Sequence, residues 1–182
     1  MNSVLIQSIK ADGYRISGSN SFGMLLILFV QDPGFRLLVL FRLSKFKGPL
    51  SLCVYLIFRY LSSRRGILIP RQVAIGPGCN LGHAFNIVIN QAARIGKNVN
   101  FAQNITIGSV GETAPRIGNN VYIGPNSVIF GDIVIGDNTV IGAGAIVNKS
   151  FDGNVLVAGN PASVIKTDIK TNIHSLLKNV KE

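Results

Sequence analysis

The chain has 182 residues and carries 18 Lys and Arg against 8 Asp and Glu, which gives a net charge of +10. This length is typical of one domain, and the charge favours an anionic partner; because no helix-turn-helix or RNA-binding signature accompanies it, we expect no nucleic acid. The two cysteines, Cys53 and Cys79, lie in unrelated contexts without a CxxC pattern, which argues against a disulfide framework or a metal site and fits a reducing cytoplasm.

Most of the basic surplus lies in residues 1–66, which hold nine Lys and Arg against two acids. Within residues 21–63 the apolar sequence is interrupted by QDPG at 31–34 and by GPL at 48–50, and both interruptions favour turns. We predict two or three short helices here, each apolar with a basic edge. The first twenty residues lack an apolar stretch ending in small residues, so no cleavable signal is expected.

Two explanations fit this helical segment. In the first, it is a cap that packs on the next domain and on sister subunits. In the second, residues 20–65 lie on anionic lipid with Arg and Lys at the headgroups. The run GMLLILFV is shorter than the about 20 apolar residues that cross a bilayer, so any membrane contact is peripheral. The expected location is cytoplasmic, with contact at the inner membrane face in the second case.

A six-residue period begins at residue 69, and glycine follows eight of its apolar positions. No helix has this period, and many of the residues are β-branched, so the pattern predicts short strands joined by tight turns in which Gly and Asn adopt positive φ. A two-residue slip and a four-residue insertion divide the period into three runs: Ile69, Ile75, Leu81; then Ile89, Ile95, Phe101, Ile107; then Ile117, Ile123, Ile129, Ile135, Ile141, Val147.

This pattern resembles the hexapeptide-repeat acyltransferases, which fold as a left-handed parallel β-helix. The resemblance implies a mainly β fold of about five coils over residues 67–166, preceded by the helical, basic segment 1–66 and followed by a tail, 167–182. The segment VLVAGNPASVI at 155–165 resembles the part of the chain that closes such helices. Because stacked coils leave open edges, the two flanking segments are expected to cover the ends.

The histidine in NLGHAFNIVINQAARIGKNVNFAQNITIG (80–108) is the strongest candidate for catalysis. This stretch is similar to the one in which serine acetyltransferases carry their catalytic histidine, and His83 falls on that position, with Asn86 where those enzymes usually have glycine. The resemblance implies acetyl-CoA as donor, His83 as general base, and direct transfer without a covalent enzyme intermediate. The alternative is that His83 is an ordinary turn residue at a coil corner. His174 is interpreted as a solvated helix residue.

The same resemblance implies residues that hold acetyl-CoA. Small residues that let the pantetheine arm approach backbone amides match Gly108, Pro125 and Ala143, and the basic residues available for the phosphates are Lys149 and Lys166. The alternative for the small residues is tight packing between coils. The donor groove in this family lies between neighbouring subunits, so a homotrimer is expected.

The acetyl acceptor is inferred from positions at which this sequence differs from serine acetyltransferases. Leu68, Gly82, Thr113 and Ala114 stand where serine acetyltransferases carry charged or imidazole groups that orient the histidine or receive serine. Because a buried site for amino and carboxylate groups needs charged partners, these departures argue against serine. The closer resemblance is to acetyltransferases of exopolysaccharide, capsule and O-antigen clusters, such as the colanic acid enzymes. We therefore expect an O-acetyltransferase that modifies a sugar hydroxyl of a surface polysaccharide or of its lipid-linked precursor. The alternatives are a serine O-acetyltransferase and a catalytically inactive β-helix that serves as an assembly module.

Overall fold

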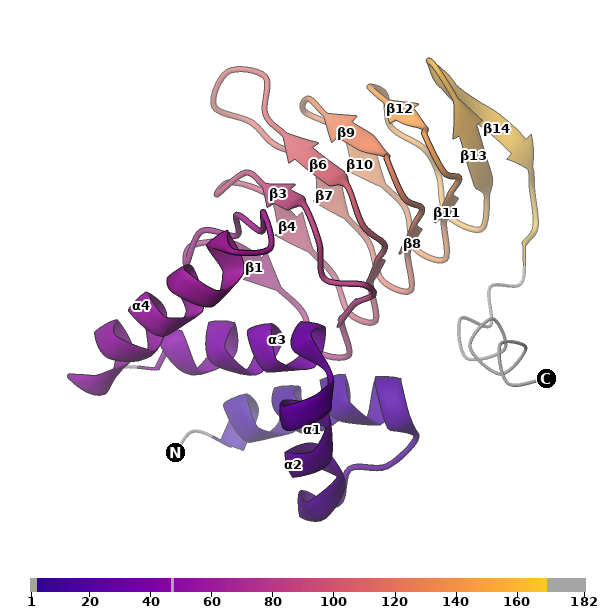
Figure 1. The fold of residues 1–182 in the computed structure, drawn as a ribbon. Coiled ribbons are helices and arrows are strands. Elements are labelled where there is room, and N and C mark those ends of the chain that lie inside the picture. The colour runs from indigo at the N-terminus through magenta and orange to yellow at the C-terminus, as the bar shows by residue number, and fades with distance from the viewer. Residues whose placement is uncertain (1–2, 47, 170–182) are drawn as a thin grey trace.

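The computed structural model describes residues 3–46 and 48–169, in which four helices precede a long parallel β-helix (Figure 1). The helices are α1 (Ser3–Ser17), α2 (Phe22–Gln31), α3 (Pro33–Ser44) and α4 (Leu50–Ser63). Three of them lie within residues 21–63, as predicted, and α1 is an addition that the sequence did not indicate.

The helix boundaries follow from the residues at the breaks. Ser21 caps α2 by accepting a hydrogen bond from the amide of Met24. Asp32 ends α2 and caps α3, because its carboxylate accepts from the amide of Phe35 at 2.8 Å. Pro33 occupies the first turn of α3, where its missing N–H costs no hydrogen bond.

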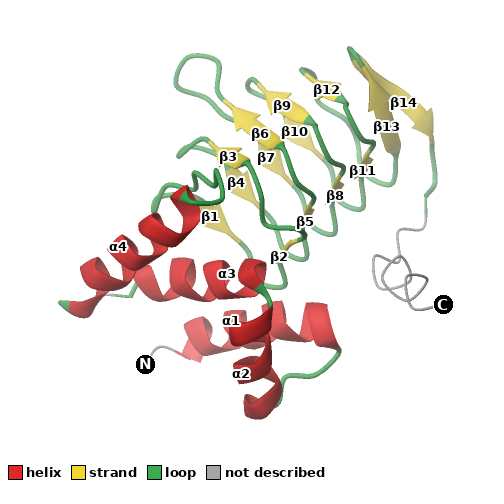
Figure 2. Cartoon of the chain, viewed as in Figure 1, coloured by secondary structure: helices red, strands yellow, loops and turns green. Residues whose placement is uncertain are grey.

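The strands form three parallel sheets that wind around one core, and Figure 2 shows them as short arrows joined by turns at the corners. The sheet orders are β1-β4-β7-β10, β2-β5-β8-β11-β13-β14 and β3-β6-β9-β12, and every pairing is parallel except that of β13 with β14. The strands are β1 (Ala74–Ile75), β2 (Asn80–Leu81), β3 (Ile87–Ile89), β4 (Arg94–Ile95), β5 (Asn100–Phe101), β6 (Ile105–Gly108), β7 (Arg116–Ile117), β8 (Tyr122–Ile123), β9 (Val128–Phe130), β10 (Val134–Ile135), β11 (Val140–Ile141), β12 (Ile146–Val147), β13 (Leu156–Gly159) and β14 (Ala162–Lys166).

The predicted parallel β-helix of about five coils is confirmed, with four complete coils and part of a fifth. The fifth coil is partial: Phe151 forms only an isolated bridge to Ile135, and β13 extends only the second sheet. The chain then reverses into β14, which pairs antiparallel with β13 and ends the stack. An antiparallel hairpin cannot continue a parallel coil, so the last repeats of the sequence close the β-helix instead of lengthening it.

Asparagine ladders stabilise the corners. The side-chain amide of Asn98 donates to Asn120 at 3.0 Å, Asn120 to Asn138 at 3.0 Å and Asn138 to Asn154 at 2.9 Å. All four residues have φ between 56° and 62°, a region that asparagine tolerates better than other residues with a side chain. The predicted role of asparagine at the turns is confirmed.

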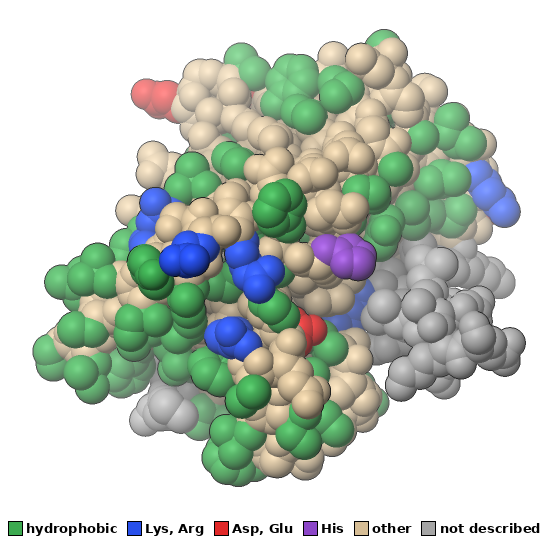
Figure 3. Space-filling model, viewed as in Figure 1, with side chains coloured by type: hydrophobic (Ala, Val, Ile, Leu, Met, Phe, Trp, Pro, Cys, Tyr) green, Lys and Arg blue, Asp and Glu red, His purple; other side chains and the backbone are tan. Residues whose placement is uncertain are grey.

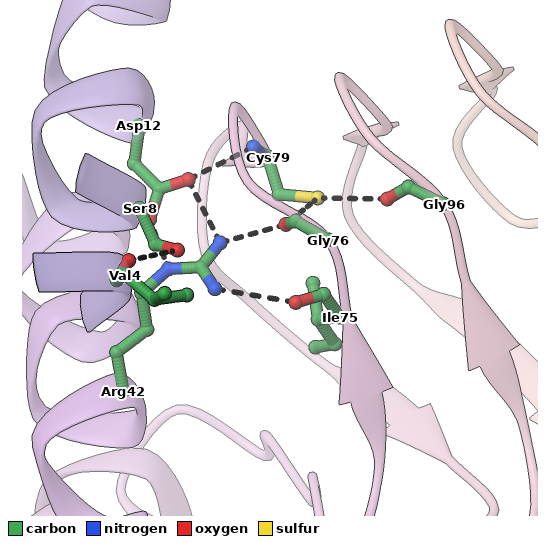
Figure 4. A network of polar contacts seen from close by, with 8 residues as sticks. All are labelled: Val4, Ser8, Asp12, Arg42, Ile75, Gly76, Cys79 and Gly96. Carbon is green, nitrogen blue, oxygen red and sulfur yellow. Dashed lines mark hydrogen bonds and ion pairs between the residues drawn. The ribbon is translucent and has the colours of Figure 1, made fainter. Parts of the chain in front are cut away.

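A buried ion pair joins the helices to the first coil (Figure 4). The carboxylate of Asp12 in α1 pairs with the guanidinium of Arg42 in α3, with Oδ1 2.9 Å from Nη2. Arg42 also donates to the carbonyls of Ile75 at 3.2 Å and Gly76 at 2.7 Å, and Asp12 accepts from the amide of Cys79 at 3.0 Å. These bonds fix both helices against the start of the β-helix.

Burial controls the titration of this cluster. It raises the pKa of the Asp12 carboxyl, and the hydrogen bonds and charge of Arg42 oppose the rise. Burial also raises the pKa of the Cys79 thiol to about 12, so this sulfur stays a neutral thiol and is not a nucleophile. The other cysteine, Cys53, is exposed on α4.

The start of α3 is seated against the second strand of the first coil. A Cβ at Gly34 would lie 2.3 Å from the carbonyl oxygen of Leu81, so only glycine permits this approach. The contact fixes the coil immediately before Gly82 and His83.

Among the described residues no single helix is long and apolar enough to cross a membrane. Helices α2 and α3 have the length and apolar composition of a membrane span only when taken together, and the two are bent by 110°.

Candidate active site

The corner that carries His83 is longer than the corner beneath it in the stack. Leu81 pairs with Phe101 and Ile87 pairs with Ile105, so five residues, 82–86, turn a corner that three residues, 102–104, turn in the next coil. This is the two-residue slip in the six-residue period. The extra residues leave the regular coil, and the imidazole of His83 is exposed.

The backbone of this corner has an unusual conformation. The φ angles are 62° at His83, 39° at Ala84 and 50° at Asn86. Every other described residue with positive φ is Gly, Asn or Asp, so His83 and Ala84 are the exceptions. Strain of this kind persists only where the surroundings enforce it, and it is frequent at functional sites.

Contacts on both sides enforce the conformation of the corner. The amide of Asn86 donates to the carbonyl of Arg65 at 2.8 Å, and its side chain donates to Asn104 at 3.2 Å. The carbonyl of Phe85 accepts from the amide of Asn104 at 3.1 Å. Ala84 is buried and anchors the corner. Within the described residues, the imidazole of His83 makes no hydrogen bond and is exposed. The ring is therefore held by its backbone and is accessible to a substrate.

An open hollow with a volume of about 360 Å³ lies beside this corner. Its wall is formed by the start of α3, the end of α4 and one residue of the corner: Pro33, Arg36, Leu37, Leu61, Arg64, Arg65 and Phe85. Figure 3 shows basic side chains gathered close to the histidine on this face. A basic edge on the helices was predicted, and Arg36 belongs to it; the sequence did not indicate that Arg36, Arg64 and Arg65 share one hollow.

The residues predicted to hold acetyl-CoA lie along different edges. Pro125 and Ala143 occupy the same type of corner as His83, between the second and third sheets, and the amide of Gly144 donates to the carbonyl of Pro125 at 2.8 Å. Gly108 ends β6, at the opposite edge of the third sheet. The third sheet therefore separates the edge of His83 from that of Gly108.

Packing does not require glycine at position 108. A Cβ there would lie 3.6 Å from the Cβ of Phe130, an ordinary contact, whereas a Cβ at Gly96 would lie 2.5 Å from the carbonyl oxygen of Gly118. Tight coil packing thus explains Gly96 but not Gly108. The assignment of Gly108 to the donor site stays a prediction.

The two predicted phosphate-binding lysines lie near the end of the β-helix. Lys149 follows β12, at the same edge as Gly108, and its ammonium lies 5.6 Å from the centre of the Phe151 ring. Lys166 is the exposed last residue of β14. Both are free to meet a ligand, and their roles also stay predictions. His174 lies outside the described residues.

The positions that depart from serine acetyltransferases lie in two places. Leu68 forms an isolated bridge with Val88, beside the corner of His83, and Gly82 is in that corner. Thr113 and Ala114 lie in the loop between β6 and β7, where the hydroxyl of Thr113 donates to the carbonyl of Val110 at 3.2 Å. In the described part of the chain, no group of three His, Cys, Asp or Glu residues is arranged to hold a metal ion.

Comparisons with known proteins identify similar chains. Residues 114–149 match the family model described as bacterial transferase hexapeptide (six repeats). A serine acetyltransferase of Buchnera aphidicola is 33% identical over 169 residues, which are 88% of this chain and 60% of that protein. One of Staphylococcus xylosus is 29% identical over 162 residues, which are 78% of this chain and 74% of that protein. The crystal structure of a serine acetyltransferase from Neisseria gonorrhoeae matches with a TM-score of 0.79 at 26% identity, over 97% of this chain and 72% of that one.

These similarities correct the expected acceptor. The expectation of a polysaccharide O-acetyltransferase is wrong, because the curated relatives and the solved structures reported above are serine acetyltransferases. Absent charged side chains at the matched positions were taken as evidence against serine, and that step was wrong. The coarser expectation of transferase hexapeptide repeats is confirmed by the match at 114–149. The chain spans about 60% of the length of the Buchnera relative.

Proposed function

We propose that this chain is an acetyl-CoA-dependent serine O-acetyltransferase in which His83 is the general base. The observation that supports the proposal best is the extent of the match to the Neisseria gonorrhoeae serine acetyltransferase, which covers 97% of this chain and so includes both the helices and the β-helix. A shared β-helix alone would support only a fold, since one fold hosts many functions.

The proposed reaction is a direct acyl transfer. The imidazole of His83 takes the proton from the serine hydroxyl while that oxygen bonds to the thioester carbonyl carbon of acetyl-CoA. The carbon–sulfur bond then breaks, and the imidazolium returns the proton to the departing sulfur. The products are O-acetylserine and coenzyme A. Cys79 is buried as a neutral thiol, which agrees with a mechanism that needs no enzyme nucleophile.

The exposed position of His83 suits this role. Its corner protrudes from the coil and is held by bonds to Arg65 and Asn104, so the imidazole can be approached without displacement of packed side chains. A base held by a constrained backbone loses little conformational freedom when it binds substrate. Acetyl-CoA is proposed to lie along the β-helix near Gly108, Pro125 and Ala143, with Lys149 and Lys166 at its phosphates.

We also propose a homotrimer. The predicted donor residues lie on two edges that flank the third sheet, and a single convex β-helix does not enclose a ligand that contacts both. Threefold association would bring an edge of one copy against the face of the next. Sedimentation velocity at micromolar concentration tests this point, and a monomer would contradict it. The cytoplasmic location stays a prediction.

The test of the function is release of free thiol from acetyl-CoA on addition of L-serine, together with mass-spectrometric detection of O-acetylserine. The assay is run over a wide range of L-serine concentrations. Cys53 is exposed and therefore accessible to thiol reagents, so a reaction without serine serves as blank. Absence of O-acetylserine at every serine concentration would overturn the proposal.

The role of His83 has a separate test. Replacement of His83 by Ala or Asn should lower turnover by about two orders of magnitude or more, because general base catalysis typically contributes that much. Asn also tolerates the positive φ at this position, so the Asn variant separates loss of the imidazole from loss of the corner conformation. Turnover that survives both changes would show that another group removes the proton.

A further inference from the structure

Helix α2 presents an apolar surface that nothing in the described chain covers. Its ten residues, FGMLLILFVQ, include no charged side chain, and none of them is buried. Phe22, Leu26, Ile27 and Val30 are 49–77% exposed. A helix of this composition in a water-soluble protein normally lies in the core or against a partner.

Helix α4 presents a second apolar surface of the same kind. Only Phe58 and Ser62 of its fourteen residues are buried. Its exposed large side chains are Leu50, Leu52, Leu56, Ile57 and Tyr60, which are 51–74% exposed. Figure 3 shows hydrophobic side chains over α4 and around α2, on the same face of the molecule.

Basic side chains lie between these two apolar surfaces. The hollow between α3 and α4 contains Arg36, Arg64 and Arg65, and no acidic side chain contributes to its wall. Arg36 donates to the carbonyl of Phe29 at the end of α2, and Arg64 donates to the hydroxyl of Tyr60 in α4 at 3.1 Å. The arginines are thus anchored beside the apolar residues. In the described ranges 3–46 and 48–169, the one side-chain ion pair found joins Arg42 to Asp12, so none of the three has an acidic partner.

We propose that this face docks on an anionic membrane surface, with the apolar residues of α2 and α4 in the acyl boundary and lipid phosphates at Arg36, Arg64 and Arg65. Apolar helices too short to span a bilayer, with arginines at their edge, have the composition of interfacial segments. Arginine suits this role because its planar guanidinium binds phosphate oxygens in pairs. The proposal does not depend on the identity of the acetyl acceptor.

The positive charge of this face argues against a twofold contact between two copies of the chain. In a twofold contact the same patch meets itself, so Arg36, Arg64 and Arg65 of one copy would face the same arginines of the other. Like charges brought together in this way destabilise a contact, whereas lipid phosphates neutralise them. A membrane satisfies both the apolar and the basic parts of the face. A threefold contact through this face, in which the patch would not meet itself, is tested below by the oligomeric state.

Docking would also place the candidate active site near the lipid. Phe85, two residues from His83, forms part of the wall of the arginine hollow. A chain bound through this face would hold the His83 corner close to the membrane surface. Acyl transfer would then take place at the membrane–water boundary.

The test is co-sedimentation of the full chain with vesicles. We expect binding to phosphatidylcholine vesicles that contain phosphatidylglycerol, little binding to phosphatidylcholine alone, and loss of binding as salt is raised. Arg64→Gln combined with Arg65→Gln should weaken binding by about tenfold or more, since each basic residue near an anionic surface contributes about fivefold. The matched control is Arg94→Gln with Arg116→Gln on the β-helix, which should change binding little.

The apolar contribution is tested with a second pair of variants. Val30→Ser in α2 should weaken vesicle binding several-fold, whereas Val134→Ser in β10, which is 52% exposed, should not. Circular dichroism of each variant shows whether the chain is folded, so that misfolding is not counted as lost binding. No binding, or equal binding to neutral and anionic vesicles, would overturn the proposal. So would a Val30→Ser variant that binds normally but sediments as a smaller oligomer, because the face would then join copies of the chain.

Discussion

The β-helix and the four helices bury their apolar side chains to different extents. Of the 18 large hydrophobic residues that are exposed in the described chain, 12 lie between Val4 and Tyr60 and only 6 lie beyond, although the β-helix is the longer part. Inside the coils, Ile105, Ile123 and Ile141 are completely buried. The coils therefore complete their own core, whereas the helices leave apolar surface for a partner.

The difference has a topological cause. Each coil stacks on a copy of itself, so an inward position in one repeat is inward in all, and only the two ends need covering. The helices are not repeats. Helices α1 and α3 pack on β2 of the first coil, as at Gly34 and Leu81, whereas α2 and α4 pack mainly on α3. The β-helix and the exposed apolar surface of the helices are thus separate regions, and the candidate active site lies where the helices meet the first coil.

The largest expected effect on stability comes from breaking the joint between the two regions. Asp12→Asn would leave the guanidinium of Arg42 buried without its counter-ion, which typically destabilises a protein by about 3–5 kcal/mol. Urea unfolding should show the loss, and hydrogen exchange should show it first in α1 and α3. Leu replacing both Asp12 and Arg42 should recover part of it, because no unpaired charge then remains buried. An Asp12→Asn variant with unchanged stability would show that the pair does not join the regions.

A matched pair of isoleucines tests the comparison directly. Ile123→Ala in the coil interior should destabilise the protein by about 2–5 kcal/mol, because it leaves a cavity in a packed core. Ile57→Ala on α4, where the side chain is 51% exposed, should change stability by about 0.5 kcal/mol or less. Thermal or urea unfolding measures both. Similar losses at the two sites would mean that α4 is covered in the folded protein in solution.

The sequence predicted the region that repeats better than the region that does not. The six-residue period identified the inward residues and the turn asparagines, and its two-residue slip marked the corner that carries His83. The expected count of about five coils agrees with four complete coils and a partial fifth, and the closing role predicted for residues 155–165 is confirmed by the hairpin of β13 and β14. In the helices, α1 was missed because SVLIQSIKADGYRIS mixes apolar with polar residues and contains Gly13, which disfavours a helix.

The parts of the site that depend on tertiary contacts were not predictable. Asp12 and Arg42 are 30 residues apart, and their pairing follows from the packing of α1 on α3, not from any local pattern. The same holds for Arg36 and Arg64, which share one hollow only because α3 and α4 lie side by side. The acetyl acceptor was predicted wrongly for a related reason. The residues at four matched positions do not show which other groups of the folded chain surround the substrate.

The smallest expected effect concerns Lys45, at the end of α3, whose ammonium donates to the carbonyl of Val73 just before β1. Burial, with help from the charges of Arg42, Arg71 and Arg94, lowers the pKa of Lys45 to about 8 from the ordinary 10.5. Between these values the unfolded chain binds a proton that the folded chain does not. Stability from this residue therefore rises as pH increases from about 8 to 10.5.

The prediction is tested by the difference between the wild type and Lys45→Met. The free energy of unfolding of the wild type, minus that of the variant, should increase as pH is raised through this window. Contributions from other titrating groups cancel in this difference. The gain should be small, because solvent reaches Lys45 and screens the cost of its charge. Lys97→Met, an exposed lysine on the β-helix, is the control and should show no comparable trend. A difference that stays constant with pH would mean that Lys45 is solvated in the folded protein and adds nothing to the joint between the helices and the coils.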